Sequence, residues 1–197
     1  IPTHLLVGSD IGRLDEILSK GAGLVFFETP TNPGLEIFDI HAIATIAHAH
    51  GALVAVDNTF ASPVNQRPLE LGADFVMHSA TKYLGGHSDI TAGALMGTKE
   101  LLAPIWNWRK NLGQMPSPET AALLSRSLRT LVVRVERQNA TAQTVAETME
   151  RHPKIARVFY PGLPGFHGHT LAKRQMKGFG GMLSIEVKGG GEAATRV

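Results

Sequence analysis

Apolar positions along the chain follow two patterns that alternate. Short dense apolar runs, each bounded by turn residues, occur at 24–30, 52–60, 73–79 and 91–97. Such runs are typical of strands buried on both faces. Between the first two runs, residues 37–51 place apolar side chains at helical spacing, with Asp39 suited to cap the helix and Gly51 to end it. This strand–helix–strand alternation predicts an α/β fold with a parallel or mostly parallel sheet covered by helices.

The pattern changes from Lys99 onward and becomes helical. Helices are predicted over 99–113, over 117–131 with Ser117 as cap and Pro118 at the first helical position, and over 132–152. A strand and a Pro/Gly loop follow within 153–169, then a helix over 170–176, a strand over 180–187 and a tail, 188–197, that reads as a loop and the start of a helix.

A domain boundary is predicted near Arg151, which divides the chain into residues 1–150 and 151–197. The second unit contains only about two strands and one helix, too few to bury both faces of a sheet. We therefore expect it to be the incomplete beginning of a small α+β domain.

The composition of the chain argues against nucleic-acid binding, a transmembrane helix and cysteine chemistry. The 197 residues allow one domain or a little more, and a net charge of 19 − 17 = +2 without a basic run gives no indication of a nucleic-acid partner. The apolar runs are strand-sized, which predicts no transmembrane helix. No cysteine is present, which excludes disulfides and thiolate chemistry. The N-terminus has no signal-peptide pattern and reads like the middle of a larger protein; a cytoplasmic location is the default expectation.

Polar residues cluster where the predicted strands end. They are Glu28 with Asn32, Asp57 with Asn58, and the group Ser79, Thr81 and Lys82. In doubly wound sheets, ligands bind beyond the carboxyl ends of the strands. If these strands are parallel neighbours, the polar side chains converge on one crevice.

The chemistry of these side chains matches the requirements of pyridoxal phosphate (PLP). Lys82 can form an imine with an aldehyde, Asp57 can hold a proton on a ring nitrogen, and Ser79 and Thr81 can donate to a phosphate. Taken singly, each has a simpler interpretation: Asp57 as a cap, the hydroxyls as turn residues, Lys82 as a surface lysine. Their order on successive strand ends favours the cofactor.

The segment Asp74 to Ser88, "DFVMHSATKYLGGHS", resembles the lysine signature of the Cys/Met-metabolism enzymes that use PLP. That family includes cystathionine gamma-synthase, gamma-lyase and beta-lyase, methionine gamma-lyase and the homoserine sulfhydrylases. Further blocks resemble the family in the family's order, at 27–33, 56–74, 127–140, 158–163 and 177–186. The resemblance covers essentially the whole chain.

The resemblance implies an aspartate aminotransferase-like fold (fold type I) and a trans-sulfuration enzyme that eliminates or replaces a group at the beta or gamma carbon of a sulfur amino acid. It implies Lys82 as the Schiff-base lysine and proton carrier, Asp57 at the ring nitrogen, Ser79 and Thr81 at the phosphate, and Asn32 at the phenolic oxygen. On the basis of this resemblance, cystathionine is the substrate that we expect. O-acyl-homoserine sulfhydrylase and methionine gamma-lyase stay as alternatives, and a truncated, non-catalytic module as an alternative of another class.

The sequence also departs from the family pattern. Family members are about twice as long and form dimers or tetramers, which implies a homo-oligomer for the full-length protein and makes this chain a middle fragment. The tyrosines, arginines and glycine-rich loop that complete the family's cofactor and substrate sites fall outside it. Ser127 stands where many relatives have glycine, and the histidines show no metal-binding spacing, so no metal is expected.

Overall fold

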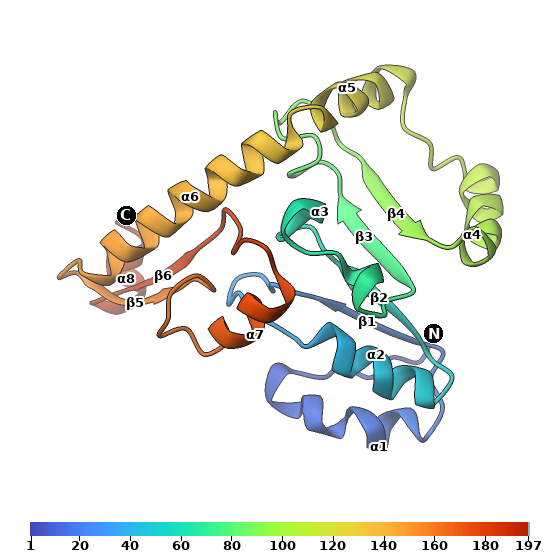
Figure 1. Cartoon of the computed structure of the whole chain (residues 1–197), viewed down its shortest axis with the longest axis horizontal. Coiled ribbons are helices and arrows are strands. Elements are labelled where there is room, and N and C mark those ends of the chain that lie inside the picture. The colour runs from blue at the N-terminus through green and yellow to red at the C-terminus, as the bar shows by residue number, and fades with distance from the viewer. Residues whose placement is uncertain (197) are drawn as a thin grey trace.

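The computed structural model describes residues 1–196, and two sheets organise the chain (Figure 1). The first sheet has the order β1 (Leu24–Glu28), β2 (Leu53–Asp57), β3 (Phe75–Ser79) and β4 (Gly93–Gly97). The second pairs β5 (Ile155–Phe159) with β6 (Ser184–Val187). The predicted α/β class and mostly parallel sheet are confirmed, since β1, β2 and β3 run parallel while β4 is antiparallel to β3.

Helices connect and flank these strands. They are the 3₁₀ helices η1 (Gly8–Arg13) and η2 (Pro68–Leu71) and the α-helices α1 (Leu14–Leu18), α2 (Ile40–Ala49), α3 (Ser62–Asn65), α4 (Lys99–Leu112), α5 (Pro118–Leu128), α6 (Leu131–Glu150), α7 (His169–Gln175) and α8 (Gly190–Ala194). In the part of the chain that the structure describes, no helix has the length and apolarity to cross a bilayer.

The predicted caps are confirmed. Asp39 accepts a hydrogen bond from the Ala42 N–H at the start of α2, and Ser117 accepts one from the Thr120 N–H at the start of α5, where Pro118 occupies the first helical position. Most elements are shorter than their apolar runs. The last predicted strand, for example, forms only over Ser184–Val187, because the glycine-rich residues before it remain irregular.

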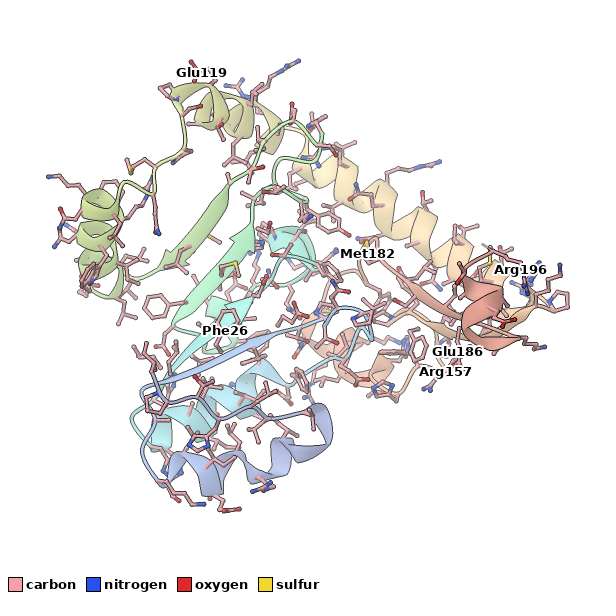
Figure 2. All side chains as sticks on the ribbon, turned by 180° about the vertical axis from the view of Figure 1, so that it is seen from behind. Phe26, Glu119, Arg157, Met182, Glu186 and Arg196 are labelled. Atoms are coloured by element: carbon pink, nitrogen blue, oxygen red, sulfur yellow. The ribbon has the colours of Figure 1, made fainter. Side chains whose placement is uncertain are left out.

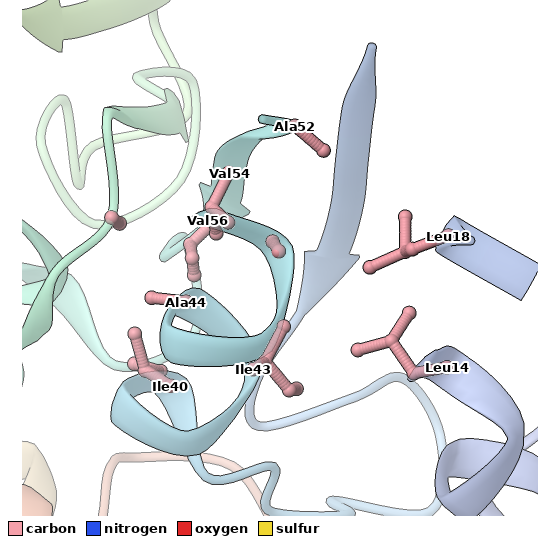
Figure 3. Close-up of a cluster of buried hydrophobic side chains, with 10 residues drawn as sticks. Leu14, Leu18, Ile40, Ile43, Ala44, Ala52, Val54 and Val56 are labelled. Carbon is pink, nitrogen blue, oxygen red and sulfur yellow. The ribbon is translucent and has the colours of Figure 1, made fainter. Parts of the chain in front are cut away.

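The main core lies between the sheet and the α1–α2 layer. Leu14 and Leu18 of α1 and Ile43 of α2 pack there with Val54 and Val56 of β2, all nearly inaccessible to solvent (Figure 3). Along β1, successive side chains point to opposite faces. Phe26 (Figure 2) therefore points away from this core and is 58% exposed.

A second cluster joins the two parts of the chain. Tyr160, which is fully buried after β5, packs there with Leu163 and with Ala142 of α6. Helix α6 runs from the first sheet to the second (Figure 1). The boundary near Arg151 stays a prediction, and of the predicted tail, Val197 lies outside the described residues.

Candidate active site

Asp57 and Ser79 lie on the same face of the first sheet. Asp57 is the last residue of β2 and is paired in register with Met77 of β3, so their side chains point to the same face. Ser79 lies two residues after Met77 and shares its orientation. The carboxylate and the hydroxyl are therefore presented at adjacent carboxyl ends of parallel strands, as the sequence predicts.

Thr59 connects these two residues. Its backbone N–H donates to Asp57 Oδ1 at 2.9 Å, and its side-chain Oγ1 accepts from the Ser79 N–H at 2.8 Å. Thr59 is buried, whereas Asp57 and Ser79 keep partial access to solvent. These partly buried hydrogen bonds connect the two strand ends.

Lys82 lies in a tight turn that begins at the end of β3. This segment, from Ser79 to His87, is called the lysine turn below. Its N–H donates to Ser79 O at 3.0 Å, and its carbonyl accepts from the Gly86 N–H at 2.6 Å. The side chain is exposed, and among the side chains that the structure describes none forms a hydrogen bond or an ion pair with Lys82 Nζ. The backbone of Lys82 is thus restrained while its amine is free to bind a ligand.

Gly85 shapes this turn by allowing a close approach. Its N–H donates to Ala80 O at 2.7 Å, and a Cβ at this position would lie 2.9 Å from Ala80 O and 2.8 Å from the Ile90 side chain. Any larger residue would push the chain outward. Glycine at position 85 is therefore a structural requirement of the turn that holds Lys82.

The hydroxyl of Thr81 forms hydrogen bonds with the backbone of Ala92. Its Oγ1 accepts from the Ala92 N–H at 3.0 Å and lies 3.3 Å from Ala92 O, to which it donates. The hydroxyl proton is directed at the backbone before β4 in this structure. Its predicted contact with a phosphate stays a prediction.

Glu28 and Asn32 lie at the end of β1. Glu28 is paired with Asp57 in the parallel register, so both carboxylates point to the same face. Glu28 Oε1 accepts a hydrogen bond from the Asn32 N–H at 2.7 Å, which folds the loop back over the strand end. Asn32 is exposed, and its predicted contact with a cofactor oxygen stays a prediction.

The other face of the sheet has a different environment. His78, next to Ser79, points to this face, where it lines a pocket with Gln66, Val76 and Met96. Burial lowers the pKa of His78 to about 4, although the charge of Asp57 acts in the opposite direction. Among the described residues, His78 Nε2 has no hydrogen-bond partner. The imidazole is therefore neutral and lies on the face opposite to Asp57 and Ser79.

Two residues of this site were not found from the sequence. Thr59 carries no signal beyond its place after Asp57, and Arg134 lies far along the chain on α6, yet its Nη1 donates to Tyr83 O at 2.9 Å. His87, whose Nδ1 lies 2.7 Å from Gly85 O, belongs to the same turn. No group of three acidic or histidine side chains suited to a metal occurs within the described part of the chain.

Comparisons with known proteins identify the family of the chain. The family model described as "Cys/Met metabolism PLP-dependent enzyme" matches residues 1–197. The chain is 48% identical over 182 residues to the chloroplastic cystathionine gamma-synthase 1 of Arabidopsis thaliana, covering 92% of this chain and 32% of that protein. It is 45% identical over 190 residues to the L-methionine gamma-lyase of Pseudomonas putida, covering 95% of this chain and 48% of that one.

A solved structure is also similar to this chain. The cystathionine gamma synthase of Xanthomonas oryzae pv. oryzae, crystallised in complex with cystathionine, superposes with a TM-score of 0.91 at 43% identity. The match covers 94% of this chain and 48% of that chain. The chain thus spans about a third to a half of the length of the relatives it matches.

Proposed function

The chain belongs to the Cys/Met-metabolism family of PLP-dependent enzymes, and from that membership we propose that Lys82, Asp57 and Ser79 hold PLP in the full-length protein. One observation carries the proposal. The register of β2 and β3 puts the Asp57 carboxylate and the Ser79 hydroxyl on one face, and Thr59 bonds to the Asp57 side chain and to the Ser79 backbone. Lys82 follows three residues after Ser79, and its amine has no partner among the described side chains.

The donor set fits the cofactor chemically. Asp57 offers a carboxylate in which Oδ1 already accepts from Thr59, while Oδ2 has no hydrogen-bond partner among the described residues. A pyridinium N–H needs such an anionic acceptor, a phosphate needs hydroxyl and backbone donors, and an aldehyde needs an amine. The carboxylate of Asp57 and the hydroxyl of Ser79 lie on one face of the sheet, opposite the neutral His78, and the Lys82 amine follows Ser79 in the next turn of the chain.

Each residue then has a defined task. Bound PLP supplies an electron sink for the negative charge that builds up at the substrate's alpha carbon. Asp57 keeps the ring nitrogen protonated by holding a negative charge beside it. The amine of Lys82 holds the cofactor before the substrate arrives and afterwards takes the alpha proton and returns it at a neighbouring carbon. Ser79 orients the phosphate, and Thr81 and Asn32 are candidate further contacts.

We propose that the reaction is elimination or replacement at the beta or gamma carbon of a sulfur amino acid. The bond from that carbon to sulfur or oxygen breaks, and its electron pair leaves with the departing group. Cystathionine gamma-synthase or gamma-lyase chemistry, with cystathionine as product or substrate, has the strongest support, because a gamma-synthase is among the relatives with the highest identity. Methionine gamma-lyase is the second candidate, at 45% identity. An O-acyl-homoserine sulfhydrylase is a further alternative within the family.

The first experiment tests cofactor binding in the full-length protein. We expect a visible absorption band after addition of PLP, loss of that band in Lys82→Ala, and retained PLP but activity lower by about 10²-fold in Asp57→Asn. Asp57→Glu, which keeps the charge, should recover part of the activity. A Lys82→Ala variant with an unchanged band would contradict the assignment.

The second experiment identifies the reaction. Release of a 2-oxo acid and ammonia from cystathionine indicates a lyase, release from methionine indicates methionine gamma-lyase, and formation of cystathionine from an O-acyl-homoserine and cysteine indicates a synthase. A protein that binds PLP but converts none of these supports a non-catalytic module. We further propose a cytoplasmic homo-oligomer, which sedimentation analysis and cell fractionation would test.

A further inference from the structure

The turn that holds Lys82 is contacted by an arginine from a distant helix. Arg134, in the first turns of α6, donates from Nη1 to Tyr83 O at 2.9 Å, and Tyr83 directly follows Lys82. Its Nη2 donates to Ser127 O at 3.1 Å, and its Nε donates to Thr130 Oγ1 at 3.1 Å. One guanidinium thus joins the lysine turn to the end of α5 and the start of α6.

The planar guanidinium gives this connection a fixed geometry. Its N–H groups form a rigid fork, so three bonds to three separate residues define its position in all directions. No carboxylate forms an ion pair with Arg134 among the side chains that the structure describes. Its charge is therefore directed at backbone and hydroxyl oxygens, and hydrogen bonds from a charged donor are stronger than neutral ones.

Gly86 in the lysine turn leaves room for the side chain of Arg134. Gly86 adopts φ = +77°, and a Cβ there would lie 2.1 Å from Arg134 Nη1. The guanidinium therefore packs directly on the backbone of Gly86. Only glycine provides both the left-handed conformation and the room for this contact.

A second contact reinforces the first. Ser127 is buried, and its Oγ lies 3.3 Å from His87 Nδ1, whose ring also contacts Gly85 O at 2.7 Å. The structure shows what the hydroxyl of Ser127 contacts. Residues at the junction of α5 and α6 thus form hydrogen bonds with the turn at Tyr83 and at His87.

These contacts fix the backbone from which the Lys82 side chain extends. Since Lys82 Nζ has no partner among the described side chains, the backbone is where the structure restrains this residue. That backbone is held by Ser79 O on one side and by the Arg134 bond to Tyr83 O on the other. Building on the function proposed above, we propose that Arg134 is a positioning residue that aims the Lys82 amine at the reacting atoms.

The test compares Arg134→Gln and Arg134→Lys with the wild type in the full-length holoenzyme. Arg137→Gln is the matched control, because Arg137 lies on the same helix, is exposed and has no hydrogen-bond partner among the described side chains. We expect kcat of Arg134→Gln to fall about 10- to 100-fold, since a displacement of about 1 Å at a catalytic group has effects of this size. The KM for substrate should change much less than kcat.

Two further readouts separate positioning from general stability. The circular dichroism of bound PLP reports how the cofactor is oriented in the protein, and it should change in both Arg134 variants but not in Arg137→Gln. Arg134→Lys keeps the charge but not the fork, so we expect at most partial recovery of kcat. If Arg134→Gln does not fold, Arg134→Lys decides the test with the same measurements.

The outcomes are distinct. A wild-type protein that neither binds PLP nor turns over a sulfur amino acid overturns the proposed function itself. An active wild type together with Arg134 variants that match Arg137→Gln in kcat and circular dichroism overturns only the positioning role. Full recovery of kcat by Arg134→Lys would also contradict it, because charge alone would then be sufficient.

Discussion

Thr59 Oγ1 accepts a hydrogen bond from the Ser79 N–H at 2.8 Å, and this bond ties the ends of two neighbouring strands together. Because the Thr59 N–H also binds Asp57 Oδ1, one buried residue sets the distance between the proposed partners of the ring nitrogen and of the phosphate. The two ends of a flat cofactor can be held only if that distance is constant.

Replacing Thr59 with valine should weaken cofactor binding. The valine side chain would have nearly the same shape but would leave the Ser79 N–H without its acceptor, at a cost of about 1–3 kcal/mol. We expect the Kd for PLP to rise about tenfold, since that factor corresponds to about 1.4 kcal/mol. Titration of the apoprotein with PLP measures it. Thr59→Ser, which keeps the hydroxyl, serves as control, and equal affinities for Thr59→Val and Thr59→Ser would refute the role of the bond.

Gly85→Ala should disturb the lysine turn. The added Cβ would meet Ala80 O at 2.9 Å and Ile90 at 2.8 Å, and overpacking of this kind costs about 1–3 kcal/mol. We expect a lower denaturation midpoint and less bound PLP at a fixed concentration. Gly23→Ala is the control, because a Cβ there meets nothing within 4 Å. A Gly85→Ala protein as stable as Gly23→Ala would show that the turn tolerates the extra atom.

His78 should make the stability of the protein depend on pH. Its pKa is about 4 in the folded protein because burial disfavours the charged ring, whereas an unfolded chain has a histidine pKa of about 6.5. Between these values the unfolded state binds more protons, so stability is complete above about pH 6.5 and is lost as the pH falls toward 4. The full loss amounts to about 3 kcal/mol.

Denaturant unfolding at a series of pH values measures this loss. His78→Gln should show a flatter profile between pH 6.5 and 4, while His41→Gln, at an exposed position of α2, should follow the wild type. If His78→Gln and wild type lose stability in parallel over this range, His78 is not the group responsible.

Tyr160→Phe should loosen the attachment of the second sheet. The Tyr160 hydroxyl is buried and donates to Gly180 O at 3.0 Å, and burial raises its pKa to about 12. Removing the hydroxyl leaves that carbonyl without this partner, which should lower the free energy of unfolding by about 1–2 kcal/mol. Phe159→Leu, next to it and only partly buried, is a control for the change of an aromatic side chain. An unchanged denaturation midpoint in Tyr160→Phe would contradict the prediction.

Much of the fold could be predicted because its signals are local. The apolar runs at 24–30, 52–60 and 73–79 each contain a strand, and the caps at Asp39 and Ser117 begin helices, since each signal depends on residues only a few positions apart. Strand direction is not encoded locally in this way. The run at 91–97 forms a strand, yet nothing within it specifies that β4 pairs antiparallel with β3.

The sequence by itself determined the sheet class, the chemical identity of the amine, carboxylate and hydroxyl, and their order on successive strand ends, because these follow from short periodic patterns and from the residue types themselves. Only the tertiary structure decided that Thr59 connects Asp57 to Ser79, and that Arg134 reaches Tyr83 across 51 positions of the chain. Hydrogen bonds between distant segments depend on how helices and strands pack, and packing leaves no periodic trace in a single sequence.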